Sequence, residues 1–229
     1  MARAKPAGKL VEIADAALAA FGRTGFRLTQ MTDVAKLCDM SAGALYGYVN
    51  DKEALFYIAV LTSIGHLDPS MPLPVLAAST EDMLALLQHE IAGRNLWPLL
   101  KAALKREKAA DVGGETAGIA GELYDLIAHD RRLIRLLDVC GRDIPEIADF
   151  FTRKIRGRYF DDFASYLKNR NAAGQMKDAV ATPVSARALV EMVAWMAAHR
   201  HGEPIPLKVT EEEARRAVQD LFASALSVT

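Results

Sequence analysis

Residues 25–55 decide the fold of this chain, and they read GFRLTQMTDVAKLCDMSAGALYGYVNDKEAL. Gly25 ends the amphipathic helix that precedes it, because glycine tolerates a positive φ just past a helix end. Thr29 then reads as the N-cap of a second helix, and Ser41 as the N-cap of a third. Asp39 falls where the chain must turn between them, and Asp is tolerated in the left-handed region. The stretch predicts two short helices joined by a tight turn, behind a longer one.

The remainder of the chain also reads as helix. Asn50 and Asp51 supply a cap for a fourth helix over 52–67, and three prolines at 69–74 stop any helix there. Periodic apolar residues then predict longer helices near 80–93, 95–110, 115–138, 144–171, 184–200 and 211–227. Start signals support two of these: Asp143 as the cap ahead of Pro145, and Thr210 as part of a capping box. The expected fold is all-α, with an N-terminal three-helix helix-turn-helix domain, a larger C-terminal helical bundle, and about nine to ten helices in total.

Composition limits the class of protein without naming a partner. The chain is 51% apolar and 25% charged, with a net charge of −1, which is typical of a soluble globular protein and does not by itself indicate nucleic-acid binding. No apolar run approaches the roughly 18 residues of a membrane span. Cys38 and Cys140 lie far apart and show no metal-ligand spacing. Two lone thiols without an export signal predict a cytoplasmic location, with the protein on the nucleoid when it is bound to DNA.

The stretch also carries a family resemblance. Its string is Gly25-Phe26-x-x-Thr29, then Val34-Ala35, then Ser41-x-Gly-Ala-Leu45-Tyr46-x-Tyr48-x-x-x-Lys52-Glu53-x-Leu55. This string resembles the DNA-binding signature of the TetR family of repressors, over about residues 8–56. Asp39 and Met40 stand where the family usually has Gly and Val, and Val49 stands where Phe is common. All three keep a turn or core role, so the resemblance holds.

The resemblance implies a helix-turn-helix domain at 1–52, a connecting helix at 53–68, and a ligand-binding and dimerisation domain at 69–229. Tyr46, Tyr48 and Lys52 are expected to bind phosphate, and Gln30 is the candidate for a bidentate adenine contact. The full predicted DNA-binding set is Thr29, Gln30, Thr32, Ser41, Ala42, Gly43, Ala44, Tyr46, Gly47, Tyr48 and Lys52. Because four of these residues carry almost no side chain, DNA shape should contribute to specificity. Arg3 and Lys5 form either a minor-groove arm or a plain solvated terminus.

The C-terminal part offers a dimer surface and an effector pocket. The segment 188–198 is apolar nearly all round, so it is either a dimer helix or deeply buried within its own domain. The residues expected at a dimer interface are Leu189, Met192, Met196, Val218, Leu221 and Phe222. The resemblance implies a ligand pocket, for which the candidates are Trp97, Tyr124, Phe151, Tyr159, Phe163 and Trp195, with Arg94, Asn95 or His129 as polar groups. Plain core packing explains each single aromatic equally well.

These observations favour a TetR-type transcriptional regulator, a repressor that a small-molecule effector releases from DNA. Its expected partners are double-stranded operator DNA of palindromic sequence, a second copy of itself, and an unknown effector, with no membrane and no cofactor. One alternative is a helical DNA-binding regulator that answers to a protein partner and has no small-molecule pocket. Another is an enzyme, but no catalytic spacing, phosphate loop or metal motif is present in the sequence.

Overall fold

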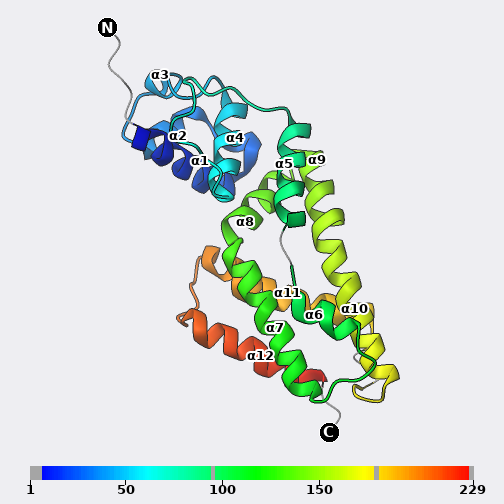
Figure 1. The fold of residues 1–229 in the computed structure, drawn as a ribbon. Helices are drawn as coiled ribbons and strands as arrows, with labels where there is room; N and C mark the ends of the chain where they lie inside the picture. The colour runs from blue at the N-terminus through cyan, green and yellow to red at the C-terminus, as the bar shows by residue number, and fades with distance from the viewer. Residues whose placement is uncertain (1–6, 94–95, 178–180, 227–229) are drawn as a thin grey trace. The chain divides into compact units, whose positions relative to one another are not determined.

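The computed structural model describes residues 7–93, 96–177 and 181–226, which fold into two compact units (Figure 1). The first unit consists of the chain up to Gly93 together with Arg132–Phe151. The second consists of Arg94–Arg131 together with the chain from Thr152 onward. Each unit is therefore built from two separate pieces of sequence. The domain boundaries expected after residues 52 and 68 stay a prediction.

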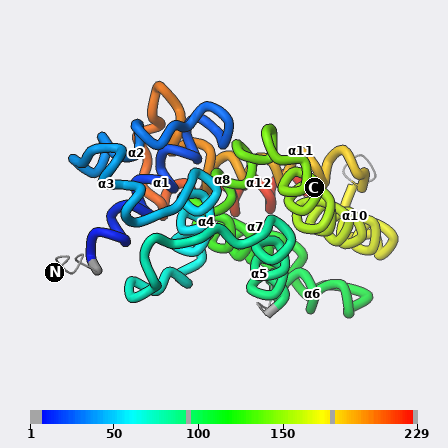
Figure 2. Tube along the Cα trace, turned by 90° about the horizontal axis from the view of Figure 1, so that it is seen from above, coloured from blue at the N-terminus to red at the C-terminus, as the bar shows by residue number. Residues whose placement is uncertain are grey.

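The first unit is built around the packing of α1 on α4. Its helices are α1 (Ala7–Leu28), α2 (Met31–Leu37), α3 (Ala42–Leu45), α4 (Lys52–Ser63), α5 (Thr80–Gly93), most of α8 (Arg131–Cys140) and α9 (Pro145–Asp149). The buried face of α1 includes Ile13, Ala17 and Phe21. Figure 2 shows α2 and α3 beside α1 in the blue part of the chain. Burial of this apolar face is what stabilises such short helices.

The second unit centres on α7, which packs against α12 and α11. Its elements are α6 (Pro98–Leu104), α7 (Val112–His129), the π-helical η1 (Phe150–Arg156, which begins in the first unit), α10 (Gly157–Ala172), α11 (Pro183–Ala197), the 3₁₀ turn η3 (His199–Gly202) and α12 (Glu211–Leu226). Phe163 lies in an aromatic core, with its ring centroid 5.7 Å from that of Trp97 and 5.6 Å from that of Phe222. This core holds α6, α10 and α12 together.

The expected all-α class is confirmed for the described residues, where the one bridge of β type joins Val49 to Val75. Four predicted helices have clearly different bounds. The helix predicted over 52–67 ends at Ser63. The segment 95–110 is helical only over Pro98–Leu104, and 144–171 divides into α9, η1 and α10. The segment 115–138 breaks between α7 and α8, where Arg131 Nε donates to the Ala128 carbonyl at the end of α7. Periodicity cannot detect such a break, because apolar residues continue on both sides of it.

Other predicted features are confirmed. The Asp51 carboxylate caps α4 through the Ala54 N–H at 2.7 Å. Thr210 and Glu213 form the expected capping box, in which the Glu213 carboxylate accepts from the Thr210 N–H at 2.8 Å and the Thr210 hydroxyl accepts from the Glu213 N–H at 3.1 Å. Among the described helices, none is both long and apolar enough to span a membrane.

Candidate nucleic-acid interface

The α2–α3 pair has the geometry of a helix-turn-helix. α2 begins directly after Gln30, whose N–H donates to the Asp33 carboxylate at 3.0 Å. Asp39 has a φ of 50°, which confirms that it turns the chain through the left-handed region. The Ser41 hydroxyl then accepts from the Ala44 N–H at 3.1 Å and caps α3, as predicted. The turn is therefore held by local hydrogen bonds that the sequence encodes directly.

Thr29 does not cap α2, and that prediction is wrong by one residue, since the N-cap is Gln30. Thr29 is buried, and its hydroxyl donates to the Gly25 carbonyl at 2.7 Å and lies 2.8 Å from the Thr24 hydroxyl. Gly25 itself has a φ of 84°, which confirms its role at the end of the regular part of α1. Thr29 thus closes the turn between α1 and α2 from the inside.

Most of the predicted contact residues lie on the surface of α2 and α3. Those classed as exposed are Gln30, Thr32, Ser41, Gly43, Ala44 and Tyr46. Ala42 and Gly47 are half-buried. Tyr48 is only 7% exposed, and its carbonyl accepts from the Val75 N–H at 2.8 Å. Tyr48 therefore belongs to the support of α3 rather than to its outer face.

Lys52 lies at the start of α4, but its ammonium group points back to the last residues of α1, after the kink at Gly25. Lys52 Nζ donates to the Arg27 carbonyl at 3.1 Å and lies 4.7 Å from the centroid of the Phe26 ring. The Phe26 ring in turn packs edge-on against Phe56 of α4. Lys52 is half-buried, so it shapes the α1–α2 turn as well as adding a cation to this surface.

Sequence reasoning missed a second support for this turn, which comes from α8 and the residues after it. The Arg27 N–H donates to Asp143 Oδ2 at 2.8 Å, and Arg135 Nε donates to the Gly22 carbonyl at 2.9 Å. Asp143 was expected to cap the helix at Pro145, but the N-cap of α9 is Ile144. That prediction is wrong because the carboxylate is engaged by a backbone N–H that is distant in sequence. No local pattern marks such a partner.

A comparison with protein families identifies these helices. Residues 13–57, which run from α1 into α4, match the family model described as bacterial regulatory proteins, tetR family. Over these residues the chain is similar to the tetR family. A match to regulatory proteins also agrees with the prediction that the chain is not an enzyme.

Solved structures similar to this chain cover nearly its whole length. The regulator PfmR from Thermus thermophilus is 18% identical, with 94% of this chain and 99% of that chain covered and a TM-score of 0.50. A regulator of the family from Mesorhizobium loti is 19% identical over 99% of this chain and 100% of that chain, with a TM-score of 0.49. No curated protein sequence matches the chain. The likeness to PfmR is one of fold.

Three of the effector-binding residues expected from the tetR resemblance lie together in the second unit. Trp97, Tyr159 and Phe163 pack together, and Trp97 Nε1 donates to the Ile119 carbonyl at 3.0 Å. Phe151 belongs to the first unit, whereas the other candidates belong to the second. The remaining placements are Tyr124 buried, Trp195 40% exposed, and His129 exposed. Arg94 and Asn95 lie outside the described residues, as do Arg3 and Lys5.

Two hollows of about 230 and 400 Å³ lie in the second unit, on α6 and around the start of α7. The smaller is lined by residues that include Arg106, Asp111 and Glu115. The larger is bounded only by residues within Pro98–Arg106, so it is a hollow beside one short helix. Neither is lined by a predicted effector-binding residue.

The candidate dimer residues divide into two groups by burial. Val218 and Phe222 are fully buried within their own unit, whereas Leu221 of α12 is 53% exposed. Leu189, Met192 and Met196 of α11 are half-buried. The large apolar side chains that these two helices leave exposed are Val184 and Trp195 of α11 and Leu221 of α12.

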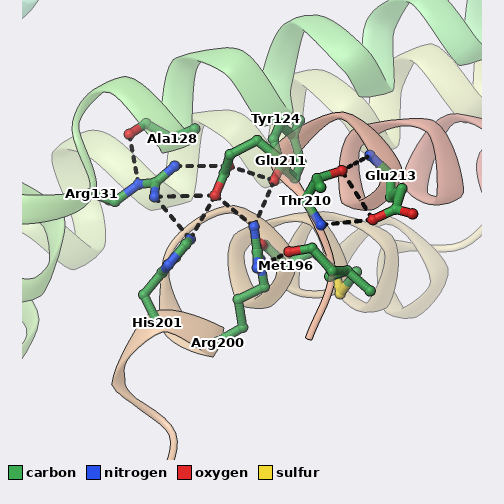
Figure 3. Close-up of polar contacts among 10 residues, drawn as sticks. Tyr124, Ala128, Arg131, Met196, Arg200, His201, Thr210, Glu211 and Glu213 are labelled. Atoms are coloured by element: carbon green, nitrogen blue, oxygen red, sulfur yellow. Dashed lines mark hydrogen bonds and ion pairs between the residues drawn. The ribbon is translucent and has the colours of Figure 1, made fainter. Parts of the chain in front are cut away.

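A polar cluster ties η3, the turn that follows α11, to the start of α12 (Figure 3). The Glu211 carboxylate accepts from Arg200 at 2.6 Å, from Tyr124 at 2.8 Å and from Arg131 at 2.9 Å, while His201 Nε2 lies 3.1 Å from it. Burial raises the pKa of Glu211, but hydrogen bonds from Arg131 and Tyr124 outweigh it, so the pKa lies below its usual value. Burial and then the two arginines lower the pKa of His201. The cluster fixes the ends of the loop between the two helices.

Proposed function

We propose that this protein is a sequence-specific DNA-binding transcriptional regulator of the TetR type, a repressor that a small-molecule effector releases from operator DNA. The observation that carries the proposal is the surface of α3. Its N-terminal residues Gly43 and Ala44 are exposed and nearly without side chains, and Tyr46 stands at its end. A helix of this kind lets its backbone approach the floor of a major groove closely, while the preceding helix crosses the phosphates.

In this proposal the exposed side chains divide into readers and anchors. Gln30 reads an adenine through its amide, and Ala44 contacts a thymine methyl group. Tyr46 donates its hydroxyl to phosphate, and Lys52 contributes a positive charge. The hydroxyl of Thr29 is buried and already donated, and Tyr48 is buried as well. Their contribution to DNA binding is therefore indirect, through the shape of the turns on either side of α2 and α3.

The operator is palindromic because the regulator binds as a homodimer through α11 and α12. The exposed Leu221 and Trp195 support this pairing, since apolar side chains that one protomer leaves exposed gain most from a second copy. A two-fold dimer places its recognition helices about 34–36 Å apart, in successive major grooves on one side of the duplex.

The effector is a small molecule held in the second unit. Its site includes the expected aromatic residues Trp97, Tyr159 and Phe163, whose rings pack together in that unit. The alternative, a regulator controlled by a protein partner, differs in one measurable respect. A small-molecule effector alone lowers operator affinity in a two-component mixture, whereas a protein-controlled regulator needs its partner to be added.

Selection of bound duplexes from a random DNA pool tests the proposal directly. The expected result is a palindrome whose half-sites lie one helical turn, or a multiple of it, apart. Enrichment of a single unrepeated site would contradict the symmetric dimer. Failure of any sequence to be enriched by the folded protein at low salt would overturn the DNA-binding function itself.

A further inference from the structure

Residues 132–143 of α8 and the following turn form a wall along α1 inside the first unit. Arg132 pairs with Asp15 at 2.5 Å, and Arg135 Nε donates to the Gly22 carbonyl at 2.9 Å. The Cys140 thiol lies 3.6 Å from the carbonyl of Phe21. Burial raises the pKa of Cys140 to about 12, so this thiol is a packing group and stays protonated. The wall therefore contacts α1 from its middle to its end.

Asp143 completes this wall at the turn where α1 gives way to α2. Its Oδ2 accepts from the Arg27 N–H at 2.8 Å, and its Oδ1 lies 3.8 Å from Arg27 Nε. The carboxylate also fills the space beside Gly25, where a Cβ atom would lie 2.9 Å from Oδ2. The Asp143 side chain is 19% exposed, so it is largely enclosed by the turn that it contacts. A charge-assisted bond in such a place is stronger than one at the open surface.

The backbone at Arg27 is consequently held from both sides. Asp143 binds its N–H, while Lys52 donates to its carbonyl at 3.1 Å. The Arg27 side chain is 82% exposed and approaches Asp143 only to 3.8 Å, so the closest contacts with these supports are made by the Arg27 backbone. Three residues further on, Gln30 caps α2. The position of Gln30 relative to α1 therefore depends on the turn that Asp143 and Lys52 fix between them.

We propose that Asp143 is a positioning residue for specific DNA binding, which acts through the Arg27 N–H and does not touch DNA. The inference rests on the proposed DNA-binding function and adds to it a residue outside the family-matched segment 13–57. Sequence-specific contacts need the reading side chains to be held in place, whereas attraction to phosphates tolerates small displacements. Loss of Asp143 therefore lowers affinity for the selected operator more than affinity for unrelated DNA.

The test compares Asp143→Ala and Asp143→Asn in the full chain, with the selected duplex and a scrambled duplex of equal length as probes. Asp143→Ala is expected to weaken operator binding ~5- to 20-fold, as for loss of one buried charge-assisted bond, and scrambled-duplex binding less than ~2-fold. Asp143→Asn keeps an acceptor for the Arg27 N–H, and is expected to stay within ~3-fold of the wild type. Asp15→Asn, which breaks the Arg132 pair farther along α1, is the matched control and should leave the ratio of the two affinities unchanged.

Equal weakening of both duplexes by Asp143→Ala would overturn the proposal, as would an Asp143→Asn variant as defective as the alanine variant. Amide exchange at Arg27 and along the first turn of α2 gives a readout that needs no DNA. Exchange there should speed up in Asp143→Ala and stay near the wild-type rate in Asp143→Asn. Unchanged exchange in the alanine variant would refute the positioning role, whether or not the wild type selects an operator. Failure of the wild type to select an operator would refute only the proposed function.

Discussion

Replacing Arg170 with methionine should destabilise the second unit by ~3–5 kcal/mol, the usual cost of breaking a buried ion pair by removing one partner. Arg170 is fully buried, and its Nε donates to Glu115 Oε1 at 2.7 Å. Its terminal nitrogens donate to the carbonyl of Ala103, in the last turn of α6, at 2.8 Å and to that of Arg106, just beyond the helix, at 2.9 Å. Methionine fills much of the same volume but leaves these acceptors unpaired.

The size of this loss in stability follows from the state in which Arg170→Met leaves the Glu115 carboxylate. The Glu115 side chain is only 10% exposed, so its carboxylate stays enclosed, with Tyr166 donating at 3.1 Å and the more exposed Arg106 at 2.9 Å. Glu115→Gln alone should also destabilise the unit, because the Arg170 charge then lacks a counterion. The double variant Arg170→Met with Glu115→Gln should lose less than the sum of the single losses, by ~1–3 kcal/mol.

Tryptophan fluorescence during urea denaturation reports the unfolding of the second unit and so measures this loss in stability. Both tryptophans of the chain, Trp97 and Trp195, belong to the second unit. Trp97 also stacks on Phe163, which in turn stacks on Tyr166 beside the ion pair. A loss below ~1 kcal/mol, the size expected for an exposed pair, would refute the reasoning. So would strict additivity of the two single substitutions.

Three further outcomes are expected. The free energy of unfolding of the second unit should fall as the pH drops below about 6.5 and level off below the folded-state pKa of His201, because burial and two arginines lower that pKa and only the unfolded chain takes up the proton in this range. His201→Gln should flatten this part of the pH profile measured by urea denaturation, and an unchanged profile would count against the prediction. Gln30→Ala should relax base preference at one symmetric pair of operator positions, at a cost of ~1–3 kcal/mol against the best site, and an unaltered selected sequence would assign specificity to DNA shape. Leu221→Glu should change the sedimenting species from dimer to monomer, whereas Leu76→Glu, at an exposed site of the first unit, should not. A Leu221→Glu variant that stays dimeric would show that the interface does not include this part of α12.

The features that the sequence predicted correctly are those with local causes. Asp39 forms the turn and Ser41 caps α3, and both could be predicted because each acts on backbone groups within a few residues of itself. Asp143 looked like a cap for the same local reason, because Pro145 follows it. Its actual partner, the Arg27 N–H, is 116 residues away. The sequence around Asp143 does not indicate whether its carboxylate caps the helix at Pro145 or accepts from this distant N–H. Tertiary contacts override local preference in this way wherever the distant group is better enclosed.

The same limit applies to the candidate sites. The exposed set on α2 and α3 could be predicted because the motif fixes which residues face outward. The aromatic residues of the second unit could not be divided in this way, since burial in a core and burial around a ligand leave the same apolar pattern. Phe151 illustrates the difficulty, because it is the last residue of the first unit and the residues that follow it belong to the second.

The first unit is built from two separate pieces of sequence, and this limits how domains can be exchanged between regulators of this kind. A chimera that exchanges only residues 1–68 would present a foreign α1 to the resident Arg135 and Asp143, whose partners are the Gly22 carbonyl and the Arg27 N–H. Both partners are backbone groups, so they survive a change of side chains but not a change in the course of the turn at Gly25. The block to transplant as a whole is residues 1–93 together with 132–151. Grafts that respect it should keep their operator preference when moved between effector domains.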